Sequence, residues 1–167
     1  MKIHGALKAL AQLELSIAKL YEYYCETLED DPDAALLFSR MAREEHRHLQ
    51  VVDYQRRLVR ANPLLFNDID LDLAEAERTT IEAQAMTVAS HPPTLDEAIG
   101  AALRIETNAA ESHYRSALAS ANEEIAAFLE NLARGDREHL GRLMEFAKKR
   151  ALSEVSPALP TPSTPGR

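Results

Sequence analysis

Two short acidic motifs that end in histidine recur about ninety residues apart in this sequence. They are Glu45-His46-Arg47-His48 and Asp136-Arg137-Glu138-His139, and in each a carboxylate precedes a histidine by three residues. Residues three apart on a helix project from nearly the same face, so each pair could bind one metal ion. Glu14 lies 31 residues before Glu45, and Glu106 lies 30 before Asp136. Two such half-sites are typical of a two-metal carboxylate centre inside a four-helix bundle.

Six positions interrupt helical stripes that otherwise carry mainly apolar residues: Glu14, Glu45, His48, Glu106, Asp136 and His139. An ionised carboxylate that is buried without a partner costs several kcal/mol. Four of them would consume much of a typical folding stability of about 5–15 kcal/mol. The stripes contain no lysine, and the nearby arginines fall on other faces. We therefore expect two divalent cations to neutralise the four acidic groups.

The donor atoms of these six residues suit iron or manganese, because both metals accept carboxylate oxygens and imidazole nitrogens. Cys25 is the only cysteine, so neither an internal disulfide nor a thiolate cage that would favour zinc can form within the chain. Zinc remains an alternative, as does a metal-free polar seam held by water or ion pairs. Four neighbouring residues are interpreted as solvated surface: Glu44, His46, Arg137 and Glu138.

The spacing of apolar residues predicts four long helices, at about residues 3–28, 33–60, 94–119 and 123–152. Thr94 and Glu97 form a capping-box pattern at the start of the third helix. The connection 64–93 has helical spacing at 71–89, with Leu71, Ala74, Ile81, Ala85 and Val88 as the expected inner stripe. The sequence thus predicts an all-α antiparallel four-helix bundle, with a long crossover that contains an extra helix between the second and third bundle helices.

Composition places the predicted bundle domain at residues 1–152 and leaves a proline-rich tail at 153–167. The tail holds four of the eight prolines and is expected to be disordered, with a docking peptide as the alternative. The net charge of -8 argues against a nucleic-acid partner. No apolar run reaches the ~18 residues of a membrane span. The first twenty residues read as an amphipathic helix rather than a signal peptide, and we expect a cytoplasmic protein.

Together these motifs resemble the rubrerythrin branch of the ferritin-like superfamily over residues 3–150. The resemblance rests on Glu14 followed by Tyr21, on Glu45-x-x-His48, on Glu106 followed by Tyr114, and on Asp136-x-x-His139 in the last helix. It implies that Glu45 and Asp136 bridge two irons. Glu14 and His48 would be terminal ligands of one iron, and Glu106 and His139 of the other. Tyr21 and Tyr114 would lie beside the site as hydrogen-bond donors, or would simply be core tyrosines.

The resemblance further implies a di-iron oxidoreductase that reduces hydrogen peroxide or reacts with dioxygen. One cysteine cannot build the four-cysteine rubredoxin domain of the family, so a separate donor, such as a rubredoxin-like protein, would supply electrons. The chain departs from the family pattern at Ala109, where an extra glutamate is usual, and at Asp136, which replaces a glutamate. The alternatives are a ferroxidase or storage-related iron-handling protein, as cargo of a larger shell, and a structural bundle with a vestigial site.

Several large apolar residues lie partly off the inner seams: Leu13, Leu20, Leu36, Phe38, Leu49 and Leu58. They could form the interface of a homodimer, which is our expectation, or pack beneath the crossover. His113 is one residue from the inner stripe. It is interpreted as an ordinary boundary histidine, with an outer-sphere proton carrier as the alternative.

Overall fold

The structure, a computed structural model, describes residues 1–66, 69–88, 91–120 and 122–150. These residues form six helices: α1 (Ile3–Thr27), α2 (Pro32–Ala61), α3 (Pro63–Phe66), α4 (Ala74–Thr87), α5 (Leu95–Ala119) and α6 (Glu123–Lys149). The four long helices begin and end within three residues of the predicted positions. The predicted tail at residues 153–167 lies outside the described residues.

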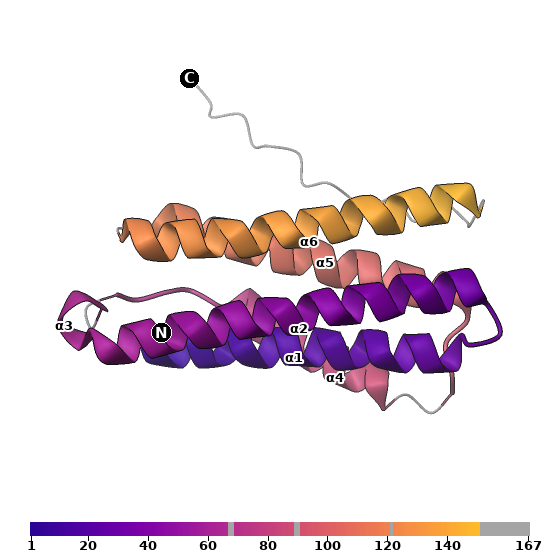
Figure 1. Cartoon of the computed structure of the whole chain (residues 1–167), viewed down its shortest axis with the longest axis horizontal. Coiled ribbons are helices and arrows are strands. Elements are labelled where there is room, and N and C mark those ends of the chain that lie inside the picture. Colours follow the sequence, from indigo (N-terminus) through magenta and orange to yellow (C-terminus); the bar gives the residue numbers. More distant parts are fainter. Residues whose placement is uncertain (67–68, 89–90, 121, 151–167) are drawn as a thin grey trace, which may run out of the picture.

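The long helices associate as two antiparallel pairs, α1 with α2 and α5 with α6 (Figure 1). The crossover between α2 and α5 returns along the bundle and contains the short helix α3 as well as α4. Helix α4 packs against α1 and also against α5. The chain is therefore all-α, and its contacts are those of a four-helix bundle with an inserted helix, as predicted.

Side-chain caps explain where three of the four bundle helices begin, whereas α1 has no side-chain cap. The Asp31 carboxylate accepts a hydrogen bond from the backbone N–H of Ala34, and Pro32 occupies the first turn of α2. Thr94 and Glu97 make the predicted capping box at α5. Asn122 accepts from the backbone N–H of Ile125 at 3.0 Å and caps α6. These caps satisfy backbone N–H groups of the first turn, whereas the packing of the apolar stripes decides which side chains point inward.

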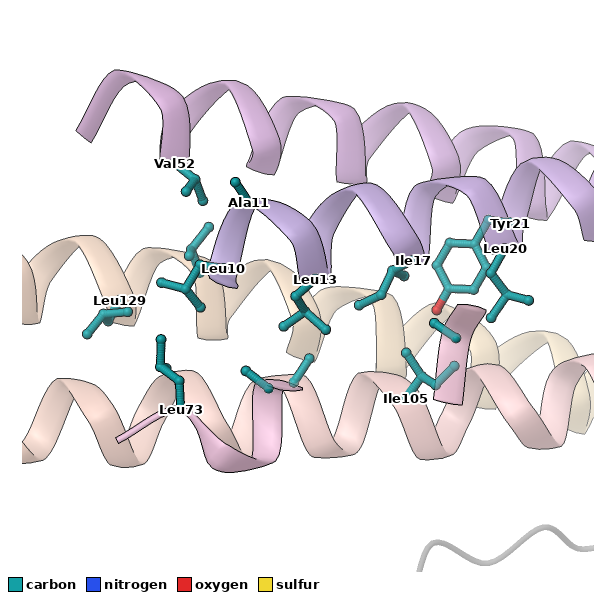
Figure 2. Close-up of a cluster of buried hydrophobic side chains, with 14 of the residues drawn as sticks. Leu10, Ala11, Leu13, Ile17, Leu20, Tyr21, Val52, Leu73, Ile105 and Leu129 are labelled. Carbon is teal, nitrogen blue, oxygen red and sulfur yellow. The ribbon is translucent and has the colours of Figure 1, made fainter. Parts of the chain in front are cut away.

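Much of the apolar core comes from the inner face of α1, which is turned towards α5 and α6. Leu10, Leu13 and Ile17 are buried, and Figure 2 shows them on the side of α1 that faces the other helices. Leu20 and Phe38 are also buried within the chain, whereas Leu36 is 66% exposed. Three of the six off-seam apolar residues, Leu13, Leu20 and Phe38, are thus buried inside the fold, and Leu49 and Leu58 are half-buried.

The buried face of α4 differs from the predicted stripe. Ile81 and Val88 are 67% and 80% exposed, whereas Ala76, Thr79 and Ala83 are buried. Small side chains let α4 approach its neighbouring helices closely, and this close packing outweighs the burial of larger apolar residues elsewhere on α4. The prediction failed because the spacing of apolar residues takes no account of their size.

The long helices carry polar residues on their outer faces and keep their apolar stripes for the bundle interior. In the parts of the chain that the structure covers, none of the helices combines the length and apolar character needed to cross a bilayer. Amphipathic helices of this kind bury their apolar faces against one another.

Candidate metal centre

Each of the four long helices places one acidic residue in the interior, close to the midpoint of that helix. Glu14 comes from α1, Glu45 from α2, Glu106 from α5 and Asp136 from α6. All four side chains are buried, with at most 2% of their surface exposed. Because the helices are amphipathic and pack through their inner faces, the acidic positions of the four stripes meet at one level of the bundle.

Two groups of three side chains bring potential ligand atoms together. The first is Glu14, Glu45 and His48, and the second is Glu45, Glu106 and His139. Within each group the ligand atoms all lie within 4.8 Å of one another. Glu45 belongs to both groups, so the two sites share a carboxylate. Five of the six residues singled out from the sequence therefore converge on two adjacent clusters that could hold metal ions.

The histidines of the two clusters face the carboxylates closely. His48 Nδ1 lies 3.4 Å from Glu14 Oε2 and 3.2 Å from Glu45 Oε2. His139 Nδ1 lies 2.7 Å from Glu45 Oε1 and 3.2 Å from Glu106 Oε1. The two imidazole rings stack with their centroids 5.4 Å apart. The pair of clusters is thus a compact unit, with Glu45 between its two halves.

Asp136, the sixth residue, lies beside the clusters rather than within them. Its Oδ2 is 2.8 Å from His113 Nδ1, and its Oδ1 is 3.9 Å from His48 Nδ1. Aspartate is one methylene shorter than the glutamate of the family pattern, and here the carboxylate is turned towards His113. A bridging role for Asp136 stays a prediction.

His113 is part of the site, and its interpretation as a boundary residue was wrong. Its side chain is completely buried, and its Nε2 lies 3.7 Å from Glu14 Oε1. Position 113 is seven residues, or nearly two full turns, after Glu106, so both residues project from one face of α5. This spacing was the signal in the sequence that could have identified His113.

The two tyrosines named from the sequence lie in different environments. Tyr21 is buried, and its hydroxyl donates a hydrogen bond of 2.5 Å to Glu106 Oε1. Figure 2 shows its hydroxyl oxygen directed from α1 towards α5. Burial and the nearby Glu106 carboxylate raise the pKa of Tyr21 well above its usual value, so the hydroxyl keeps its proton. Tyr114 is instead 45% exposed, and its ring faces the guanidinium of Arg137.

Glu44 is a second site residue that the sequence interpretation missed. Its Oε2 lies 3.0 Å from His139 Nε2, and its side chain is also paired with Arg40 and Arg142. Burial opposes ionisation, but the two arginines outweigh it and lower the pKa of Glu44. The carboxylate can therefore hold one nitrogen of His139 and leave the other facing the cluster. The contact joins α2 to α6, so no local pattern in the sequence indicates it.

Gly135 provides the space that His48 occupies. A Cβ atom at position 135 would lie 2.4 Å from His48 Nε2. Real Cβ atoms essentially never come this close to another heavy atom, so any larger residue on α6 would displace the imidazole. The absence of a side chain at Gly135 therefore positions His48 next to Glu14 and Glu45.

Histidines are the only cationic partners of the four buried carboxylates within the described parts of the chain. Burial opposes charge on these histidines, yet the carboxylates raise the pKa of His48 to about 11 and of His139 to about 12. Both oxygens of Glu14 remain without a hydrogen-bond partner, and burial raises its pKa. One oxygen of Glu45 and one of Glu106 also lack a partner.

Divalent metal ions fit this site on both charge and chemistry. Three imidazolium groups could offset at most three of the four carboxylate charges, whereas two divalent cations offset all four. The unpaired carboxylate oxygens supply the ligand atoms that such cations require. The residues present therefore suit a pair of metal ions.

Comparison with known proteins places the chain in a family. No curated protein and no solved structure matched it. A family model described as Rubrerythrin matches residues 7–147, a range that contains Glu14, Glu45, Glu106 and Asp136. The 167 residues contain one cysteine, so they include no four-cysteine rubredoxin site. With the fold, the buried clusters and a family match over most of its length, this chain belongs to the rubrerythrin family.

Proposed function

We propose that this protein is a di-iron oxidoreductase that reduces hydrogen peroxide with electrons from a separate donor. The observation that carries the proposal is the carboxylate of Glu45, which is shared by two buried clusters of ligand atoms. Two adjacent irons can each give one electron, which is the number that reduction of a peroxide requires. Oxygen and nitrogen donors suit iron, although manganese or zinc could substitute.

The clusters suggest how the ligands are divided. Glu14 and His48 would hold one ion, Glu106 and His139 the other, and Glu45 would contact both. Tyr21 keeps its proton and directs it at Glu106 Oε1, which fixes the orientation of that carboxylate. Glu44 fixes the ring of His139 from the opposite side. Such supporting contacts hold ligands in place and tune the bound metal.

The electron donor is proposed to be a separate protein of rubredoxin type. The support for this proposal is that the chain has only Cys25 and so cannot build a four-cysteine iron centre within its 167 residues. Each turnover needs two electrons for every peroxide, and the two irons would then return to the ferrous state. A donor that delivers one electron at a time would have to act twice in each cycle.

Anaerobic reconstitution with ferrous iron tests the proposal. Addition of one hydrogen peroxide for every two ferrous ions should oxidise both ions rapidly, consume two protons and yield two waters. The increase in near-ultraviolet absorption of ferric iron reports the reaction in a stopped-flow instrument. Absence of rapid oxidation by peroxide would contradict the proposal.

Glu45→Ala should abolish binding of two ions per chain, and retention of both ions would overturn the ligand assignment.

The main alternative is iron handling, with ferrous iron as a substrate that dioxygen oxidises. The same oxygen-rich clusters favour it, because ferroxidation also requires two ferrous ions side by side. Two results together would support this alternative: dioxygen oxidises the iron faster than peroxide does, and each chain turns over more than two irons.

Deletion of residues 153–167 tests whether the proline-rich tail is needed for a partner such as a shell.

A further inference from the structure

We propose that His113 is a direct ligand of the metal ion held by Glu14 and His48, and that Asp136 orients the imidazole of His113. This inference rests on binding of two ions at the clusters, which the proposed function also requires, but not on reduction of peroxide. It replaces the bridging role expected of Asp136 and adds a third histidine to the site.

The contacts of His113 assign different roles to its two ring nitrogens. Nδ1 lies 2.8 Å from Asp136 Oδ2. An ionised carboxylate only accepts hydrogen bonds, so Nδ1 must carry the proton in this contact. In the neutral imidazole, Nε2 then has a free lone pair, and this is the form of histidine that binds metals.

The free nitrogen points to a carboxylate that also lacks a partner. His113 is completely buried, and its Nε2 has no hydrogen-bond partner in the structure. The nearest acidic atom to Nε2 is Glu14 Oε1 at 3.7 Å, and that oxygen has no hydrogen-bond partner either. Two acceptor atoms that face each other in a dry interior repel one another unless a proton or a metal cation lies between them.

The separation of these two atoms suits a shared ion. Two metal–ligand bonds of about 2.1 Å that meet at roughly 120° place their outer atoms about 3.6 Å apart. The value for His113 Nε2 and Glu14 Oε1 is 3.7 Å, and that for His48 Nδ1 and Glu14 Oε2 is 3.4 Å. Each of the two histidine nitrogens therefore lies at a distance from one Glu14 oxygen at which the two atoms could share an ion.

The other cluster also contains a histidine with one ring nitrogen directed at the cluster and the other held by a carboxylate. His139 presents Nδ1 to Glu45 and Glu106, while its Nε2 is held by the Glu44 carboxylate. A metal-bound histidine commonly donates its second N–H to a carboxylate, which fixes the ring and increases its basicity. Asp136 stands to His113 as Glu44 stands to His139. The ion at Glu14 would thus have two nitrogen ligands, and the ion at Glu106 would have one.

The variant His113→Asn separates the two roles of the residue. The amide nitrogen of asparagine can replace Nδ1 as the donor to Asp136, but no atom of asparagine reaches the position of Nε2. Anaerobic calorimetric titration with Co²⁺, a stand-in for ferrous iron, measures the two binding events. We expect wild-type protein to bind two ions. His113→Asn should weaken one of them by at least about 100-fold and leave the other within about threefold.

Asp136→Asn is the matched second variant, because the side-chain oxygen of asparagine can still accept from His113 Nδ1. If Asp136 only orients His113, this variant should weaken the same single ion, and by about 100-fold at most. A bridging Asp136 would instead make both ions weaker. The melting temperature of each metal-free variant reports whether folding is preserved. Should His113→Asn fail to fold, His113→Gly with added imidazole provides the same test through rescue of the weakened ion.

Wild-type affinity for both ions in His113→Asn would overturn the inference and leave the proposed function intact. Weakening of both ions in Asp136→Asn would also overturn it, in favour of a bridging carboxylate. A wild-type chain that binds no Co²⁺ would overturn both this inference and the proposed function. Recovery of the second ion when imidazole is added to His113→Gly would confirm that the nitrogen itself is the ligand, since a purely structural residue would not be replaced in this way.

Discussion

At the scale of single residues, Gly135 determines whether His48 can reach the clusters. Gly135→Ala would place a methyl group 2.4 Å from His48 Nε2 in the present arrangement. Because the imidazole ring can rotate away, we expect the helix to tolerate the change while one metal ion binds at least about 10-fold more weakly, the size of effect seen when a ligand's support is lost. Calorimetric titration with a divalent metal measures this difference.

Gly141 on the same helix is the control for this prediction. A Cβ atom there would meet nothing within 4 Å. Gly141→Ala should leave metal affinity unchanged and stabilise the protein by about 0.8–1.0 kcal/mol, the difference in helix propensity between the two residues. Equal metal affinity in both variants would show that Gly135 does not position His48.

Glu44 offers a second test at this scale. Glu44→Gln removes the negative charge that faces His139 Nε2 at 3.0 Å but keeps the size of the side chain. We expect the ion near Glu106 to bind about 10–100-fold more weakly, because the orienting partner of its histidine ligand is lost. Metal titration in a fluorescence competition assay would measure the loss for that ion.

Glu22 provides the comparison, since it pairs with His46 at 2.8 Å on the exposed surface. Glu22→Gln should leave both metal affinities unchanged, because neither residue of that pair belongs to a cluster. If Glu44→Gln behaves in the same way as Glu22→Gln, the contact between Glu44 and His139 has no part in metal binding.

At the level of single residues, the sequence predicted those site residues that are charged but lie at apolar positions of a helix. Glu14, Glu45 and Glu106 stand out because each interrupts an apolar stripe. His113 was interpreted as a boundary histidine because the expected inner stripe of this helix contains Tyr114, the next residue, although the seven-residue spacing from Glu106 pointed to His113. Glu44 could not be found in this way, since its role depends on a contact between two helices that are distant in the sequence.

At the scale of helices, α4 packs through small residues. Ala83 is buried and Ala85 is exposed on the same helix. Ala83→Leu would force α4 away from its neighbours, and we expect a loss of about 1–3 kcal/mol in the free energy of unfolding. Denaturation by urea, followed by circular dichroism, measures this change.

Ala85→Leu adds the same atoms on the solvent side of α4 and should change stability by no more than about 0.5 kcal/mol. Greater destabilisation by Ala85→Leu than by Ala83→Leu would mean that α4 packs through the face predicted from its large apolar residues. The comparison therefore tests the corrected orientation of the crossover helix directly.

The ends of the helices were predicted better than the face of α4. Capping depends on residues next to one another in the chain, so Thr94 and Glu97 could be recognised in the sequence. The orientation of α4 depends on how closely it approaches other helices, which apolar spacing does not reveal. The short helix α3 lies within a segment read as a connection, and Pro63 at its start explains how it forms.

At the scale of the whole molecule, the bundle brings four buried acidic groups to one level of its interior. The all-α architecture and the long crossover were predictable, because stripe spacing and connection length constrain both. The division of these groups between two clusters was not predictable from spacing alone, because it depends on which side chains meet. Asp136 illustrates this, since it has the expected register but is turned to His113.

Neutralisation of this buried charge by two cations can be measured by anaerobic metal titration combined with thermal melting. At free Co²⁺ about 100-fold above each dissociation constant, each ion should stabilise the protein by about 2.7 kcal/mol. At about 2–4 °C per kcal/mol, two ions should raise the melting temperature by roughly 10 °C or more, with two ions bound per chain. A chain that binds no ion and melts at the same temperature with and without Co²⁺ would contradict the account.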